Sequence, residues 1–505
     1  MNYKKLGKIL GKIMVLEGVL MLVPLLISLI YQEPDKNVLA FAVPAFALVC
    51  IGFLLQLPKP HRETLYQREG FALTALVWVV MAVFGAIPFV INGEIPSFVD
   101  ACFEITSGFT TTGASIVDDI GALSHSTLFW RSFSHWIGGM GILVFVLIFI
   151  PEGKDGSSMH LLRAESPGPQ VGKIVSKMKA TAQILYLIYL AMTVLEIVVL
   201  SFDSPIKGYE DDKFFFSMLT AFGTAGTGGF GFIPGSMELL SPFSQYVIAT
   251  FMLLFGINFT LYYLLLIGKV GAVLKSEEFR AYLLIVVTSI ALVFISLLTK
   301  AQGFYLDFST EEAFRHSYFQ VASLITTTGY TTTDYSIWPT SATVVLLFLM
   351  LVGGMAGSTA GGLKTSRIMI AVKGLYVNVR KMINPRYVPK VKLEGKTLEE
   401  KTINGVFAFI CLYFFVVIFV TFLLCFDGVN GTMVGGVEHG FLSNFSSAIA
   451  CLSNIGPGFE AVGPYASYSA FNPFSKIVLT ITMILGRLEI LPVLVLFSPR
   501  TWKKA

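Results

Sequence analysis

Long apolar stretches separated by short polar segments fill most of this chain. Ten of them approach the length of about 20 residues that spans a lipid bilayer. We predict a membrane-spanning helix for each, over residues 9–31, 38–56, 71–92, 128–150, 179–202, 243–268, 279–299, 341–363, 402–426 and 474–497. The pattern indicates an all-α polytopic membrane protein.

A shorter apolar segment lies inside each of the last four pairs of stretches, at 97–109, 212–223, 312–325 and 441–452. Segments of about 10 to 14 residues are too short to span and suit re-entrant half-helices. The order predicts an N-terminal helix pair followed by four pseudo-symmetric helix–half-helix–loop–helix repeats around one pore. The predicted units are the helix pair at 1–57, pore repeats at 70–151, 178–268, 279–370 and 402–498, and a basic cytoplasmic loop at 371–401.

A glycine-centred loop follows each predicted half-helix. We call these the filter loops: loop 1 at 110–114 (TTTGA), loop 2 at 225–229 (AGTGG), loop 3 at 326–330 (TTTGY) and loop 4 at 453–457 (SNIGP). Non-helical backbone at membrane depth is tolerated only when protein buries it or when it lines a watery cavity. The four loops are therefore expected to face inward around one axis.

Backbone carbonyls can replace the water shell of a cation, and glycine allows the unusual dihedral angles that aim successive carbonyls at an axis. We align Gly228 with the other filter glycines because a threonine precedes it, as in loops 1 and 3. The predicted ion-binding residues are Thr111, Thr112, Gly113, Gly226, Thr227, Gly228, Thr327, Thr328, Gly329, Asn454, Ile455 and Gly456.

A second glycine-rich segment interrupts the apolar stretch 341–363. Each glycine costs a helix about 1 kcal/mol relative to alanine, so this stretch is expected to break or bend. The candidate gate residues in it are Gly353, Gly354, Gly357, Ser358, Gly361 and Gly362. The alternative is close helix packing through small residues.

Arg487 lies inside the last apolar stretch. A charge there is expensive and usually functional, so we add Arg487 to the gate. The alternative is a structural pair with a buried acid.

The distribution of charged residues predicts how the chain is oriented in the membrane. Hydrophobic residues make up 54% of the chain and charged residues 13%, against about 25% charged in soluble domains. Ten spans place both termini on the same side of the membrane, which we take as the cytoplasm. The segments on that side then carry most of the basic residues, above all the segment 364–401. This basic stretch, with Lys364 and Arg367, suits either a regulator or anionic lipid headgroups.

Acidic residues gather on the opposite side, beside the filter loops. They are Asp100, Asp118, Asp119, Glu210, Asp211, Asp212, Glu238, Asp307, Glu311, Glu312, Asp334, Glu438 and Glu460. We expect the loops to open outward into an acidic vestibule that concentrates cations. The alternative is that these acids form an ordinary solvated loop surface.

Enzyme chemistry finds no support in the sequence. The six histidines show no metal-ligand spacing such as HExxH, and no P-loop or dinucleotide fingerprint is present. We predict that the protein is not an enzyme, that it holds no organic cofactor, and that its partners include the bilayer but no nucleic acid.

Three motifs resemble the Trk/Ktr/HKT superfamily of cation transporters: Phe129–Arg131 with Trp136–Gly141, Gly353–Lys364, and Asn454–Gly458. The resemblance covers essentially the whole chain. The initial helix pair makes it most similar to the TrkH branch, because the KtrB branch lacks that pair.

This resemblance implies potassium uptake across the bacterial cytoplasmic (inner) membrane, with K⁺ bound at the filter residues. It also implies a homodimer with a pore in each protomer, and a cytoplasmic nucleotide-binding regulator of the TrkA type. The glycine-rich break and Arg487 would then close the pore beneath the filter. In the plant HKT branch a serine at the first filter glycine goes with sodium selectivity, so Gly113 favours potassium. A potassium symporter of the KtrB type, coupled to H⁺ or Na⁺, stays open as the alternative.

Overall fold

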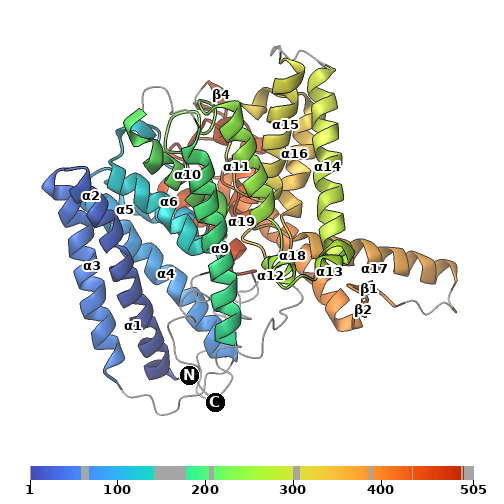
Figure 1. Ribbon diagram of the computed structural model, residues 1–505, viewed down its shortest axis with the longest axis horizontal. Coiled ribbons are helices and arrows are strands. Elements are labelled where there is room, and N and C mark those ends of the chain that lie inside the picture. The colour runs from blue at the N-terminus through green and yellow to red at the C-terminus, as the bar shows by residue number, and fades with distance from the viewer. Residues whose placement is uncertain are drawn as a thin grey trace.

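The chain begins with a helical hairpin (Figure 1). The structure, a computed structural model, describes residues 2–58, 67–141, 178–203, 210–299, 308–384, 386, 390–434, 436–490 and 493. Helices α1 (Tyr3–Leu20) and α2 (Leu22–Ile30) form one span, and α3 (Asp35–Gln56) returns beside it. Gly11 and Gly52 let the two backbones touch, because a Cβ on Gly11 would lie 2.5 Å from the Gly52 carbonyl oxygen. Small residues are the usual means of close helix packing in membranes.

Twelve of the described helices that follow form four groups of three, each a long helix of 22–25 residues and then two shorter ones. The groups are α4 (Gln67–Ile91), α5 (Phe98–Phe109) and α6 (His125–Gly139); α9 (Met178–Ser201), α10 (Lys213–Gly226) and α11 (Pro242–Phe255); α14 (Glu277–Leu298), α15 (Thr310–Ile325) and α16 (Thr340–Val352); and α18 (Glu400–Leu424), α19 (Phe441–Ser453) and α20 (Pro473–Arg487). Helices α5, α10, α15 and α19 lie where the half-helices are predicted, so those four predictions are confirmed.

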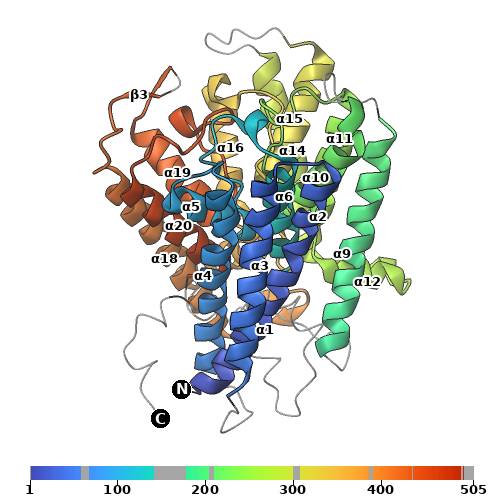
Figure 2. The same cartoon turned by 90° about the vertical axis from the view of Figure 1, so that its left-hand side faces the viewer.

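The half-helices occupy the interior, with the long helices around them (Figure 2). Ser97 and Ser309 cap α5 and α15, and Glu312 completes a capping box with Ser309. These polar caps begin the half-helices abruptly, since they satisfy amides that a helix start leaves without a partner. The half-helices start near one face of the molecule, which we call the filter face. Helix α1 begins at the opposite face.

The prediction of ten complete spans needs correction. Within the described residues, six helices are long and apolar enough to cross a membrane, or seven if a bent pair counts as one. That pair is α11 and α12 (Phe259–Leu266), which meet at 92°. Helix α16 ends at Val352, well short of residue 363, and α20 ends at Arg487. Helix α6 ends at Gly139, and residues 142–150 lie outside the described part.

At the ends of α6 and α20, glycine brings the backbone against a half-helix. A Cβ on Gly138 would overlap the Phe109 carbonyl oxygen, and one on Gly486 would overlap that of Leu452. Hydropathy does not register such breaks, since the residues beyond them are also apolar. Helices α6 and α20 therefore stop where the half-helices α5 and α19 end.

A long helix leaves the body on the side away from the filter face (Figure 1). Helix α17 (Thr365–Ile383) follows the glycine-rich segment directly, and short α13 (Val270–Lys275) lies near its start. Strands β1 (Lys392–Leu393) and β2 (Lys396–Thr397) form an antiparallel hairpin. A small apolar cluster of Ile370, Leu393 and Val406 joins α17, this hairpin and α18. The predicted basic loop 371–401 is thus largely helix and hairpin.

The other regular elements in the described part of the chain are short connections. They are β3 (Met433–Val434) paired with β4 (Val437–Glu438), and the 3-10 turns η1 (Ile120–Ala122), η2 (Glu210–Asp212), η3 (Tyr335–Ile337) and η4 (Glu460–Val462). The unit boundaries predicted from the sequence remain predictions.

Candidate functional site

All four half-helices end in the same strained turn. Thr111, Thr227, Thr327 and Asn454 have φ between 55° and 57°, the left-handed region. A residue with a side chain costs roughly 1–2 kcal/mol there, and such strain persists mainly at functional sites. The next amide in each loop bonds back to the half-helix, over 2.8 or 2.9 Å: Thr112 to Ser107, Gly228 to Gly223, Thr328 to Ser323 and Ile455 to Ala450. The loops therefore share one backbone geometry.

Two residues after each strained residue comes a glycine with positive φ. These are Gly113, Gly229, Gly329 and Gly456, with φ of 79°, 70°, 85° and 99°. No Cβ fits on Gly113, because it would overlap the Gly228 carbonyl oxygen of loop 2. The other junctions repeat this approach: Gly229 meets the carbonyl of Thr328, Gly329 that of Ile455, and Gly456 that of Thr112.

These four contacts run from loop 1 to loop 2, to loop 3, to loop 4 and back to loop 1. The loops therefore form a closed ring, as predicted from their repetition. Carbonyl oxygens of four equivalent residues lie in that ring, and glycine keeps side chains out of it. Such a ring offers a cation the oxygens that it loses with its water shell.

The alignment of loop 2 is corrected by one residue. Gly229, and not Gly228, has the positive φ and contacts the next loop, while Gly228 holds the position of Thr112. Gly226 belongs to the last turn of α10 and packs against the backbone of His135. The matched triplet is Thr227, Gly228 and Gly229. The sequence Ala-Gly-Thr-Gly-Gly offers two glycines after its threonine, and only the backbone angles separate them.

His135 supports loop 2 from behind. Its Nδ1 lies 2.8 Å from the Gly108 carbonyl oxygen, and the Phe230 amide lies 3.3 Å from its Nε2. Nδ1 therefore donates and Nε2 accepts, which is the neutral tautomer. A Cβ on Gly228 would overlap the His135 ring. His135 thus joins half-helix α5 to loop 2.

A cavity of about 370 Å³ opens above the ring on the filter face, and we call it the vestibule. All four ring glycines line it, together with Asp118, Arg131 and Tyr465. Tyr465 donates a hydrogen bond to Glu238 over 2.7 Å. Partial burial, with this bond to a carboxylate, raises the pKa of Tyr465 well above its ordinary value. The phenol therefore stays neutral and adds no charge to the vestibule.

The acidic vestibule is less acidic than predicted. Among the described residues that line it, Asp118 is the one carboxylate. Other acids hold structure instead: Asp100 pairs with Lys476 at 2.7 Å, Glu311 with Arg315 at 3.0 Å, and Glu312 and Glu460 accept backbone amides. These four acids therefore have structural partners, a role that differs both from a vestibule lining and from the solvated loop surface given as the alternative. Asp307 lies outside the described residues.

Beneath the ring, the chain from Gly353 to Lys364 forms an irregular segment that we call the gate loop. Gly353, Gly357, Gly362 and Lys364 all have positive φ. The Gly361 amide donates to Thr327 Oγ1 over 2.6 Å, and the Gly362 amide donates to the Ser453 carbonyl over 3.0 Å. The predicted break is thus confirmed, and the loop touches the base of loops 3 and 4.

Three anchors hold the other side of the gate loop. The Met355 amide donates to Gly256 O and the Phe259 amide donates to Gly357 O, both over 3.0 Å, at the bend between α11 and α12. Glu278 of α14 accepts the Ala356 amide at 2.8 Å. Within the loop, Thr365 N bonds Gly354 O and Ser358 Oγ bonds Met355 O. Glu278 resembles an ordinary first-turn acid, so sequence reasoning missed its role.

Arg487 reaches under the ring from the end of α20. Its Nη1 donates to the Thr359 carbonyl over 3.1 Å and to Thr111 Oγ1 over 3.3 Å. Its Nη2 donates to the carbonyls of Gly138 and Gly139 at the end of α6. The side chain therefore links loop 1, the gate loop and α6 at one point.

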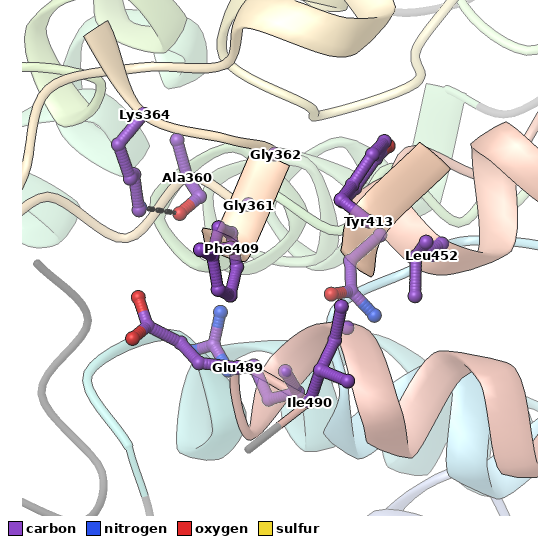
Figure 3. A pocket seen from close by; sticks show the side chains of 12 residues that line it. Ala360, Gly361, Gly362, Lys364, Phe409, Tyr413, Leu452, Glu489 and Ile490 are labelled. Atoms are coloured by element: carbon purple, nitrogen blue, oxygen red, sulfur yellow. Dashed lines mark hydrogen bonds between the residues drawn. The ribbon is translucent and has the colours of Figure 1, made fainter. Parts of the chain in front are cut away.

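The space around Arg487 is nearly filled. A cavity of about 20 Å³ lies there, lined by residues of the gate loop, α18, α19 and α20 (Figure 3). That volume is close to the room one water molecule needs. The Lys364 side chain runs toward the Ala360 carbonyl and donates to it. Arg487 and the gate loop therefore leave little open space at this point beneath the ring.

Lys364 and Arg367 do not offer the docking face suggested by their charge. Lys364 is buried within the gate loop, and Arg367 lies over the Phe409 ring at 4.2 Å. Arg367 also pairs with Glu489 at 2.6 Å. Both cations hold the gate loop to its neighbours, so the exposed basic residues begin further along α17.

Comparison with known proteins gives consistent matches. A family model described as "TrkH: Cation transport protein" matches residues 39–504. The Trk system potassium uptake protein TrkH of Escherichia coli K12 is 33% identical over 515 residues, which cover all of both chains. The Trk system potassium uptake protein TrkG of the same strain is 31% identical and covers 96% of this chain and 95% of its own. The crystal structure of the potassium transporter TrkH from Vibrio parahaemolyticus is 30% identical over the full length of both chains, with a TM-score of 0.84.

Proposed function

This chain belongs to the TrkH family of cation transport proteins, and from that premise we propose that it takes up K⁺ across the bacterial cytoplasmic membrane. The ion would pass through the ring of filter loops, one pore in each chain. The relatives named above are potassium uptake proteins, which supports K⁺ as the substrate.

The closed ring of glycine-to-carbonyl contacts is the observation that carries this proposal. A monovalent cation needs several neutral oxygens at once, and backbone carbonyls provide them without a full charge in the membrane. The proposed ion-binding residues are Thr111, Thr112, Gly113, Thr227, Gly228, Gly229, Thr327, Thr328, Gly329, Asn454, Ile455 and Gly456. This set replaces Gly226 with Gly229.

Orientation follows from charge. Basic residues cluster on α17 and the β1–β2 hairpin, away from the filter face, and this distribution favours that side as the cytoplasm. The filter face and its vestibule would then lie outside, with both termini inside. K⁺ would enter the vestibule, lose water at the ring, and meet the gate loop before the cytoplasm.

The gate loop and Arg487 form the proposed gate. A guanidinium under a cation filter opposes K⁺ by charge and by volume, and four hydrogen bonds hold it there. Opening requires the gate loop to leave Arg487, Thr327 and Ser453. The gate residues are Gly353, Gly354, Gly357, Ser358, Gly361, Gly362 and Arg487.

Regulation would come through α17, which begins where the gate loop ends. Its exposed face and the hairpin carry basic residues that suit a cytoplasmic nucleotide-binding regulator of the TrkA type. A movement of α17 would pull directly on Lys364 and the gate loop. Two such chains would form the homodimer implied by the family.

A potassium symporter of the KtrB type is the second candidate, because the interior holds buried carboxyl groups. Glu17 and Glu196 are at most 1% exposed. Neither lines the vestibule or the cavity beneath the ring, so their placement does not favour a proton path through the filter.

The two candidates differ in what sets the potential of zero net flux. The purified protein is placed in liposomes with a K⁺ gradient, alone and with imposed H⁺ or Na⁺ gradients. An uncoupled pore gives a zero-current potential that follows the K⁺ gradient in every case. A shift of that potential with the H⁺ gradient would favour coupled symport and overturn the pore proposal.

A further inference from the structure

A buried ion pair lies directly behind loops 1 and 2. Glu104 is on half-helix α5 and Arg131 is on α6, with Arg131 Nε 2.8 Å from Glu104 Oε1. Their side chains are 0% and 1% exposed. The gate does not use this pair, and the filter residues do not include it.

The pair bonds to both loops just beyond the ring. Glu104 Oε1 accepts from Ser115 Oγ over 3.0 Å, and Glu104 Oε2 accepts from the Ile116 amide over 2.9 Å. Arg131 Nη2 donates to Ser115 Oγ over 3.2 Å, and Nη1 donates to the Gly231 carbonyl over 3.1 Å. Ser115 and Gly231 hold matched positions, each two residues after a ring glycine. The pair therefore spans the junction between loop 1 and loop 2.

At two other junctions the bonds nearest the ring come from neutral groups. Tyr330 of loop 3 bonds the Thr220 carbonyl over 3.3 Å, and the Tyr468 amide bonds the Ser115 carbonyl over 2.8 Å. Glu104 lies seven residues before Thr111, and the equivalent residues of the other half-helices are Thr220, Gln320 and Ser447. Exposed Asp118 also accepts from Ser467 and Ser469 between the segments after loops 1 and 4, so among the described residues it is the fully buried ion pair that is particular to this junction. Charge-assisted hydrogen bonds are shorter and roughly twice as strong as neutral ones.

Arg131 also lines the vestibule, with its guanidinium 4.2 Å from the Phe230 ring. An unbalanced cation there would repel an incoming ion. Glu104 balances that charge and fixes the direction of the guanidinium. Because the Glu104–Arg131 pair is buried, breaking it is costly, since one partner would remain as an uncompensated charge inside the protein.

We propose that Glu104 and Arg131 are positioning residues that set K⁺ over Na⁺ discrimination by fixing the spacing of loops 1 and 2 at the ring. This inference rests on the proposed filter function. A looser junction lets the carbonyls close around the smaller Na⁺, so selectivity falls while the pore still conducts.

The test compares the wild type with Glu104→Gln, Ser115→Ala and Asp100→Asn in liposomes. Asp100→Asn is the matched control, since it removes another α5 carboxylate, whose ion-pair partner is Lys476 of α20. The K⁺/Na⁺ permeability ratio is taken from zero-current potentials. Glu104→Gln is expected to lower it by about tenfold, which corresponds to about 1.4 kcal/mol. Ser115→Ala, which keeps both charges, lowers it by a smaller factor, and Asp100→Asn leaves it unchanged.

Wild-type ratios in conducting Glu104→Gln and Ser115→Ala would overturn the inference. Should Glu104→Gln fail to fold, Ser115→Ala decides alone, because its loss of one hydroxyl leaves the ion pair intact. A change in thermal stability without a change in the ratio marks a merely structural pair and also overturns it. A wild type without preference for K⁺ would instead overturn the filter proposal itself.

Discussion

Arg487 donates a hydrogen bond from Nη1 to the backbone carbonyl oxygen of Thr359 over 3.1 Å. This contact joins the end of the last helix to the gate loop, directly beneath the ring of filter loops. It connects two features that are far apart in the sequence, a glycine-rich break and a lone arginine, into one closure. The bonds around it predict how the closure responds to single substitutions.

Replacing Arg487 by glutamine is expected to raise K⁺ flux about tenfold, because the loss of about 1.4 kcal/mol of closed-state stabilisation is a factor of 10 in an equilibrium. The variant removes the charge under the ring and most of its hydrogen bonds. Flux of ⁸⁶Rb⁺ into liposomes measures the change. Arg280→Gln, at an exposed position on α14, serves as the control and keeps the wild-type flux. Shortening the gate loop within 356–362 acts in the same direction, and unchanged flux in both variants contradicts the gate.

Replacing Glu278 by alanine is expected to free the start of the gate loop. The carboxylate accepts the Ala356 amide at 2.8 Å, and hydrogen bonds to charged groups contribute about 1.5–3 kcal/mol. Open-channel activity in planar bilayers should rise, with the K⁺/Na⁺ ratio unchanged because the ring is untouched. Glu400→Ala, an exposed acid in the first turn of α18, is the control. A reduced ratio in Glu278→Ala would show that the anchor acts on the filter and not on the gate.

The corrected alignment of loop 2 has its own consequence. Gly229→Ala places a side chain on a residue whose φ is 70°, which costs roughly 1–2 kcal/mol. The new Cβ would also overlap the Thr328 carbonyl oxygen. The displaced carbonyl is expected to lower K⁺/Na⁺ discrimination, measured by competition of Na⁺ with ⁸⁶Rb⁺ uptake. Gly231→Ala lies two residues further on, where the neighbours of a Cβ are at least 3.6 Å away, and should behave as wild type. Equal selectivity in the two variants argues against Gly229 as a ring residue.

Bound K⁺ should stabilise the folded protein, because a ligand that binds only the folded state adds about 2.7 kcal/mol at 100 times its Kd. Thermal unfolding in detergent is therefore expected at a higher temperature in KCl than in NaCl or choline chloride of equal ionic strength. Gly229→Ala should lose most of the difference. A wild type that unfolds at the same temperature in all three salts lacks the proposed K⁺ site.

The sequence predicts the half-helices well, because a short apolar segment followed by a glycine-centred loop recurs in the same order four times. It also predicts the break at Gly353–Gly362, because so many glycines do not suit a straight helix. Hydropathy cannot show that α11 turns by 92° into α12, because apolar residues continue past the bend.

Three further features depend on geometry that one-dimensional patterns do not carry. The choice between Gly228 and Gly229 rests on a backbone angle. Lys364 and Arg367 look like surface cations but bond within the gate region, and Glu278 looks like a helix-start acid but holds the gate loop. The acids near the loops are mostly caps and ion-pair partners, a use that composition alone does not distinguish from a vestibule.

The central claim is that the ring closed by Gly113, Gly229, Gly329 and Gly456 is a K⁺-selective filter. The most direct test is the zero-current potential of the wild-type protein between equal concentrations of K⁺ on one side and Na⁺ on the other. The account predicts a large potential of the sign set by K⁺ permeation, reduced in Gly229→Ala. A wild-type potential near zero, with K⁺ and Na⁺ carried equally, would contradict it.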